Sequence, residues 1–165
     1  MSQMNRLARV VAAIGKLPAF LRPFAITKAF TSQVRFAGTG KVQILELAEG
    51  RSLLQMKNLR RVQNHIGTIH ASAMGLLAES ATGIVVGMTL PDSKVPVLKS
   101  QHVDYVKRAK GTLRAEATLP PDLRARLLNE DKGDFAVPVK VTDETGEEPV
   151  KCQFVWAWIP KKRPS

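Results

Sequence analysis

Residues 68–86 constrain the fold more than any other part of the chain. This segment is rich in Ala and Leu, which favours a long helix. Small side chains recur along it, at Ala71, Ala73, Gly75, Ala78 and Ala81. Because the helix is apolar nearly all round, it must be buried, and its small residues let a neighbouring sheet approach closely.

The sequence on both sides of this helix indicates antiparallel strands. Apolar runs at 41–47 and 52–56, separated by Glu49-Gly50-Arg51, predict a hairpin. After Pro91 the apolar period becomes two, most clearly at 112–119. Further predicted elements are strands at 97–106, 135–142 and 150–159, and a short surface helix at 120–129. This order predicts an α+β fold in which an antiparallel sheet curls around one long helix.

The first 45 residues are strongly basic, because they contain no Asp or Glu. Their cations are Arg6, Arg9, Lys16, Arg22, Lys28, Arg35 and Lys41. Apolar residues from Leu7 to Leu17 recur every three or four positions, which predicts a short amphipathic helix that ends at Pro18 and again near Pro23. A mitochondrial presequence has this composition. We favour a basic helical segment, residues 1–33, that packs on the domain of a cytoplasmic protein.

Composition limits the class of protein. With 165 residues and 44% hydrophobic content, the chain can bury one core, so we expect a single domain. The single cysteine, Cys152, excludes an internal disulfide, and no Cys/His spacing typical of zinc is present, so we expect no metal. Arg, Lys and Pro interrupt the apolar runs before the roughly 20 residues of a membrane span, so we expect none.

The net charge of +11 favours an anionic partner. Nucleic acid, an anionic membrane surface and a phosphate-bearing small molecule such as a coenzyme A ester all meet this condition. Aromatic residues are only 5% of the chain and RNP-like patterns are missing, which argues against nucleic acid.

Glu79 is the residue of the apolar helix that needs an explanation. A carboxylate there must face solvent, find a partner or line a cavity, because an unpaired buried charge is costly. Ser72, Gly75 and Glu79 fall on one helical face, and the small residues leave room for a ligand or a water.

The residues that precede the helix offer the second half of a catalytic site. Thr68 is a suitable N-cap, and free backbone N–H groups at a helix start stabilise negative charge such as that on a thioester carbonyl under attack. Gly67 would allow close approach of a substrate to the backbone.

The segment NHIGTIHASAMGLLAESATG, residues 64–83, resembles the signature of the PaaI-type hotdog thioesterases. In that family Asn, Gly and His lead into the central helix and an acid follows nine residues after the His, positions held here by Asn64, Gly67, His70 and Glu79. The segment is still more similar to a thioesterase-like group of hotdog proteins with a domain of unknown function. A weaker similarity at HVDYVKRAKGTLRAEA extends the match to about residues 40–158, and we expect a hotdog domain at 34–160 followed by a basic tail at 161–165.

The resemblance implies an acyl-CoA thioesterase without a cofactor. Glu79 would act as general base on water or as nucleophile on the acyl carbon, alternatives that the sequence leaves open. Asn64 would position the water or the thioester carbonyl, and Gly67 or its neighbours would donate an N–H to the oxyanion. His70 would fix the loop by a hydrogen bond. In place of the family's glycine pair and Asp, this chain has Ala71-Ser72 and Glu79.

Substrate contacts and assembly follow from the same resemblance. Thr68, Ser72 and Gly75 would border the acyl thioester, and the basic turn of Lys107, Arg108 and Lys110 would meet the coenzyme's phosphates. Hotdog domains pair so that their sheets continue across a dimer with active sites between subunits, so we expect a homodimer or homotetramer.

Two other functions compete with hydrolysis. Hotdog dehydratases and hydratases use a His on the loop and an acid fourteen residues later, the separation of His65 and Glu79. However, the Phe-Pro and Pro-Gly elements of that family's loop are missing from residues 66–74. The third alternative is a protein that binds acyl-CoA without turning it over.

Overall fold

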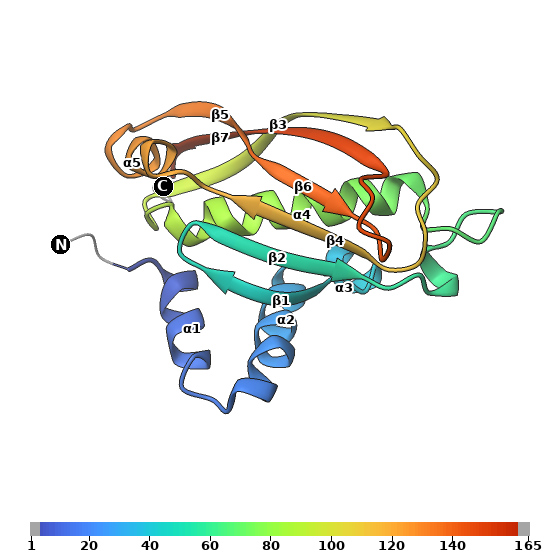
Figure 1. Cartoon of the computed structure of the whole chain (residues 1–165). Helices are drawn as coiled ribbons and strands as arrows, with labels where there is room; N and C mark the ends of the chain where they lie inside the picture. The colour runs from blue at the N-terminus through green and yellow to red at the C-terminus, as the bar shows by residue number, and fades with distance from the viewer. Residues whose placement is uncertain (1–3, 162–165) are drawn as a thin grey trace.

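The computed structural model describes residues 4–161, and the chain runs through three N-terminal helices before it enters the sheet (Figure 1). The first elements are α1 (Arg6–Ile14), the 3-10 turn η1 (Ala19–Leu21), α2 (Arg22–Gln33) and α3 (Arg35–Thr39). The hairpin β1 (Gln43–Ala48) and β2 (Arg51–Met56), the turn η2 (Arg60–Val62) and the long helix α4 (Ala71–Thr89) follow. The remaining elements are β3 (Lys94–Tyr105), β4 (Leu113–Thr118), α5 (Pro121–Asn129), β5 (Gly133–Val137), β6 (Val139–Thr142) and β7 (Val150–Pro160).

The seven strands form one antiparallel sheet that curls around α4 (Figure 1). Its order is β1-β2-β4-β6-β7-β3, and β5 also pairs with β7. Alternate residues of β4, namely Leu113, Ala115 and Ala117, are fully buried against the helix, as the period-two pattern predicts. The predicted α+β hotdog fold, a sheet wrapped around one central helix, is confirmed.

Helix α4 is the centre of the core. Leu77, Ala78 and Ala81 are fully buried, and the Ser52 hydroxyl donates a 2.8 Å hydrogen bond from β2 to the Ala81 carbonyl. By length and composition α4 could cross a membrane, so the expectation that every long apolar run is interrupted was wrong here. Its burial inside the sheet explains the same composition, because the core helix of a soluble protein is equally apolar.

The N-terminal helices are fastened to this body at two points. The buried Asn5 side chain donates to the carbonyls of Gly87, Met88 and Leu90 at the end of α4, at 2.7–3.1 Å. In α2, the Thr27 hydroxyl accepts a 2.8 Å hydrogen bond from the Ile44 N–H, where β1 departs from regular pairing.

Proline explains two differences from the predicted elements. Pro23 does not end a helix but lies in the first turn of α2, where a residue without an N–H costs no hydrogen bond. Pro138 divides the predicted 135–142 strand into β5, which pairs with β7, and β6, which pairs with β4 and β7. Of the predicted basic tail, residues 162–165 lie outside the described residues.

Candidate active site

One face of α4 is turned away from the sheet and carries Glu79. Gly75, Glu79, Gly83 and Gly87 follow one another at intervals of four and are each partly exposed, whereas the three residues between each pair are buried. Because four residues make slightly more than one helical turn, these positions form one stripe along the helix. Three of its four members are glycines: Gly75 leaves open space on one side of Glu79, whereas the Trp156 ring covers Gly83 on the other.

A cavity of about 700 Å³ lies between this stripe and the helices α1 and α2. Its wall includes Glu79 and is otherwise mainly apolar, with Val10, Phe30, Val34, Leu76, Ile84 and Trp156. The Trp156 ring is held in place by a 2.9 Å hydrogen bond from its Nε1 to the buried Thr82 hydroxyl. Volume and lining are typical of a site for a small organic ligand with a long apolar part.

The Glu79 carboxyl has an unusual environment for a charged group. Among residues 4–161 no side chain or backbone group forms a hydrogen bond or an ion pair with it. Burial raises the pKa of this carboxyl above its ordinary value, because the charged form is poorly solvated beside the apolar wall. A carboxylate with a raised pKa accepts a proton more readily, as a general base must.

Asn64 organises the turn before α4. Its Oδ1 accepts from the N–H groups of Ile66 and Thr68, both at 3.1 Å, and its Nδ2 donates to the Thr68 hydroxyl at 2.8 Å. Gly67 has a φ of 76°, which favours glycine, and its N–H donates to the Asn64 carbonyl at 3.1 Å. The N–H groups of Ile66, Gly67 and Thr68 are thus all engaged within the turn.

The helix begins later than predicted, and His70 rather than Thr68 is its N-cap. His70 Nδ1 accepts a 3.1 Å hydrogen bond from the Ser72 N–H, whereas the Thr68 hydroxyl is occupied by Asn64. Among residues 4–161 the N–H of Ala71, the first of the helix, has no hydrogen-bond partner. A free N–H at a helix start is suited to an oxyanion.

A single chain does not bring the two halves of the predicted site together. Glu79 follows Ala71 by eight residues, about 12 Å along the helix axis at 1.5 Å per residue. Asn64, Gly67 and His70 do not line the cavity that contains Glu79.

The basic turn of Lys107, Arg108 and Lys110 lies near the start of α4. Arg108 Nη2 donates to the Ile66 carbonyl at 3.1 Å, which places its guanidinium over the 64–68 turn. Lys107 pairs with Glu147, and this hydrogen bond raises the pKa of Lys107. The Lys110 side chain is exposed.

Two of the predicted substrate-contact residues, Ser72 and Gly75, have free space beside them, and the start of α4 also has a hydrogen bond that was not predicted. Ser72 is exposed, and nothing within 4 Å would meet a Cβ at Gly75. Tyr105, at the end of β3, donates a 3.0 Å hydrogen bond to the Ala71 carbonyl.

The remaining predicted group, His65, does not meet its expected partner within the chain. It is exposed on the turn before α4, and no hydrogen bond or ion pair within residues 4–161 joins it to Glu79. Residues 4–161 also contain no group of three or more His, Cys, Asp or Glu side chains that could hold a metal.

Comparison with protein families identifies the chain. A model for a domain of unknown function, DUF4442, matches residues 24–159. The chain belongs to this family. No curated protein is significantly similar in sequence.

Several solved structures share the fold of this DUF4442 protein. A Pseudomonas aeruginosa protein of unknown function, with a suggested thioesterase activity, superimposes with a TM-score of 0.76 at 23% identity, over 88% of this chain and 97% of its own. A Haemophilus influenzae thioesterase gives 0.66 at 14% identity, over 81% and 90%. A glutamine-to-alanine variant of a Staphylococcus aureus thioesterase gives 0.64 at 16% identity, over 76% and 99%. At these identities the likeness establishes the hotdog fold.

Proposed function

We propose that this DUF4442 protein is an acyl-CoA thioesterase that hydrolyses its substrate at Glu79. The observation that carries the proposal is a half-buried carboxyl without a partner in the wall of an apolar cavity of about 700 Å³. An acyl chain is an apolar ligand that ends in a polar, electrophilic carbonyl. The cavity would take the chain and Glu79 would meet the carbonyl. Thioesterases among the structures of the same fold support this choice.

In the general-base route, Glu79 accepts a proton from water while the water oxygen bonds to the acyl carbon. The carbonyl oxygen becomes an oxyanion, the C–S bond then breaks, and the proton passes to the departing thiolate, which gives a free acid and coenzyme A. In the nucleophilic route the carboxylate bonds to the acyl carbon, the C–S bond breaks and the coenzyme leaves as a thiolate. Water then hydrolyses the mixed anhydride to the free acid and the Glu79 carboxylate, and a proton from that water passes to the thiolate.

The oxyanion donor in this proposal is the free Ala71 N–H of a second copy of the chain. Strand β3 ends the sheet, and none of the described strands pairs with its outer edge. Two β3 edges joined about a two-fold axis would continue the sheet and could bring Glu79 of one protomer to the α4 N-terminus of its partner. A homodimer is therefore the smallest active unit we propose, and Arg108 and Lys110 would meet the coenzyme's phosphates at that helix start.

The test is release of free thiol from short, medium, long and aromatic acyl-CoAs, compared between the native protein and Glu79→Gln. Loss of a general base typically lowers turnover by roughly 10²–10⁴-fold. Glu148→Gln is the matched control, because Glu148 is also a partly exposed glutamate but pairs with Lys140 and does not line the cavity. Unchanged turnover in Glu79→Gln would remove Glu79 from the chemistry.

The two alternative functions predict other outcomes with acyl thioesters. Intact acyl-CoA that binds tightly would indicate a binding protein. Loss of water from a hydroxyacyl thioester without thiol release would indicate a dehydratase that uses His65 and Glu79.

A further inference from the structure

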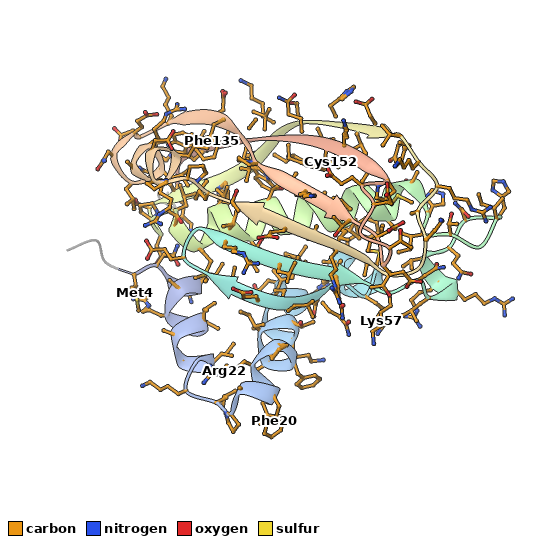
Figure 2. The ribbon with its side chains drawn as sticks, in the orientation of Figure 1. Met4, Phe20, Arg22, Lys57, Phe135 and Cys152 are labelled. Atoms are coloured by element: carbon orange, nitrogen blue, oxygen red, sulfur yellow. The ribbon has the colours of Figure 1, made fainter. Side chains whose placement is uncertain are left out.

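The turn between α1 and α2 exposes more large apolar surface than any other part of the described chain. Phe20 and Phe24 keep 80% and 73% of their surface exposed, and Leu17 and Leu21 beside them keep 38% and 39%. We call residues 16–24 the hairpin tip. Figure 2 shows Phe20 and Arg22 at the end of the helical hairpin that points away from the sheet.

These apolar residues do not serve the core or the cavity. The core of the N-terminal segment is provided by other residues, such as Leu7, Val11 and Phe30, which pack on the body. The cavity wall contains no residue of the hairpin tip. Large exposed aromatic residues that gather at one place commonly mark a contact with another molecule.

The charge around the tip is of one sign. Lys16 and Arg22 lie within it, and Lys28 follows one turn later on α2. None of these three cations forms an ion pair within residues 4–161, and no acid occurs before Glu46. An apolar surface framed only by cations is complementary to the interface of an anionic bilayer, where apolar groups enter the acyl region and cations meet phosphates.

We infer that the hairpin tip docks this protein on anionic lipid membranes. Phe20, Leu21 and Phe24 enter the interface, and Lys16, Arg22 and Lys28 contact lipid phosphates. A second copy of the chain is a poorer occupant, because symmetric pairing of this surface would set its cations against the same cations. Docking of this kind does not depend on the proposed hydrolysis.

The experiment is sedimentation of the full chain with vesicles of phosphatidylcholine alone and of phosphatidylcholine mixed with phosphatidylglycerol. We expect binding to the mixed vesicles, weakened by salt because the attraction of surface charges is screened. The double variant Phe20→Ser/Phe24→Ser should lower the partition coefficient by about tenfold or more, since two exposed aromatic side chains no longer leave water. Both side chains are exposed, so the thermal midpoint should change little.

Matched controls separate the tip from general surface properties. Leu128→Ser removes from α5 an apolar residue that is 38% exposed, as Leu17 is, and Lys132→Gln removes an exposed cation outside the hairpin. Both should bind as the native protein does, whereas Lys16→Gln/Lys28→Gln should lose affinity for the mixed vesicles only.

Three results would overturn the inference. The first is that the native protein binds neither kind of vesicle. The second is that Phe20→Ser/Phe24→Ser binds the mixed vesicles as tightly as the native protein does. The third is that substitutions in the hairpin tip abolish self-association or RNA binding and leave vesicle binding unchanged.

Discussion

The same substitution, glycine to alanine, should have opposite effects on the free energy of unfolding at two positions of α4, Gly75 and Gly83. A Cβ at Gly83 would lie 2.7 Å from Trp156 Cζ2 and 2.8 Å from its Cη2. Nothing within 4 Å would meet a Cβ at Gly75. Both residues lie on the same face of the same helix, so their intrinsic helix propensities are comparable and the difference reports on packing.

The expected magnitudes follow from these distances. Replacement of a glycine inside a helix by alanine favours the folded state by about 0.8–1 kcal/mol, so Gly75→Ala should stabilise the chain by roughly that amount. At Gly83 the new methyl group must displace an indole that is buried and held by its hydrogen bond to Thr82. Overpacking of this kind costs about 1–3 kcal/mol, so Gly83→Ala should be destabilising by about 0–2 kcal/mol after the helix gain.

The assay is urea unfolding of both variants and the native protein at one protein concentration, followed by far-ultraviolet circular dichroism and tryptophan fluorescence. The difference between the variants should be about 1–3 kcal/mol, with Gly75→Ala the more stable. Equal shifts of the two unfolding midpoints would refute the reasoning, because they would mean that Trp156 moves aside freely or that Gly75 is as crowded as Gly83.

Three further predictions concern titrating groups. Burial disfavours ionisation of Asp143, but hydrogen bonds hold its pKa below the ordinary value. Their donors are the Thr145 hydroxyl and the backbone N–H groups of Thr145, Lys110 and Glu147. Asp143→Asn should therefore lose about 2–3 kcal/mol at neutral pH, a loss that fades as pH falls through the lowered pKa of Asp143, measured by urea unfolding. Burial, and then the charge of Asp104, raise the pKa of Cys152 to about 11, so a thiol reagent at neutral pH should label the native protein far more slowly than the unfolded chain. Because the folded-state pKa of Glu79 is raised, its stabilising protonated form is lost as pH rises, so Glu79→Gln should be more stable than the native protein at neutral pH and equally stable in acid.

The architecture could be predicted from the sequence because each element has a local cause. The period-two pattern of residues 112–119 needs one buried face, and β4 has it. The apolar run of α4 needs burial on most sides, and the sheet provides it. The break at Pro138 could have been predicted from its missing N–H, but its effect on pairing depends on which strands lie on either side, and that is a tertiary property.

The start of α4 shows why local rules fail at the site. Thr68 is a good N-cap by side-chain chemistry, yet Asn64 engages both its hydroxyl and its N–H. The helix can therefore begin only after a residue whose acceptor is available, which is His70. Competition between two side chains for one set of backbone groups is not visible in residue preferences taken one at a time.

Open space for a ligand beside Glu79 was predicted, but the part of α1 and α2 in its wall was not, for a different reason. The amphipathic pattern of α1 predicts an apolar face, but a face that packs on the core and a face that borders an open space require the same residue types, as Leu7 and Val10 illustrate. What distinguishes the two is whether the facing element fills the space, which depends on tertiary packing: α4 presents Glu79, Gly83 and Gly87 to the cavity, although the Trp156 ring covers Gly83. The signal in the sequence is the glycine four residues before the carboxylate: nothing within 4 Å would meet a Cβ at Gly75, and a close-packed core rarely leaves such a gap beside a charge. The apolar surroundings in α4 thus make a charged Glu79 costly to bury, and the glycine one turn earlier leaves room for a ligand beside it.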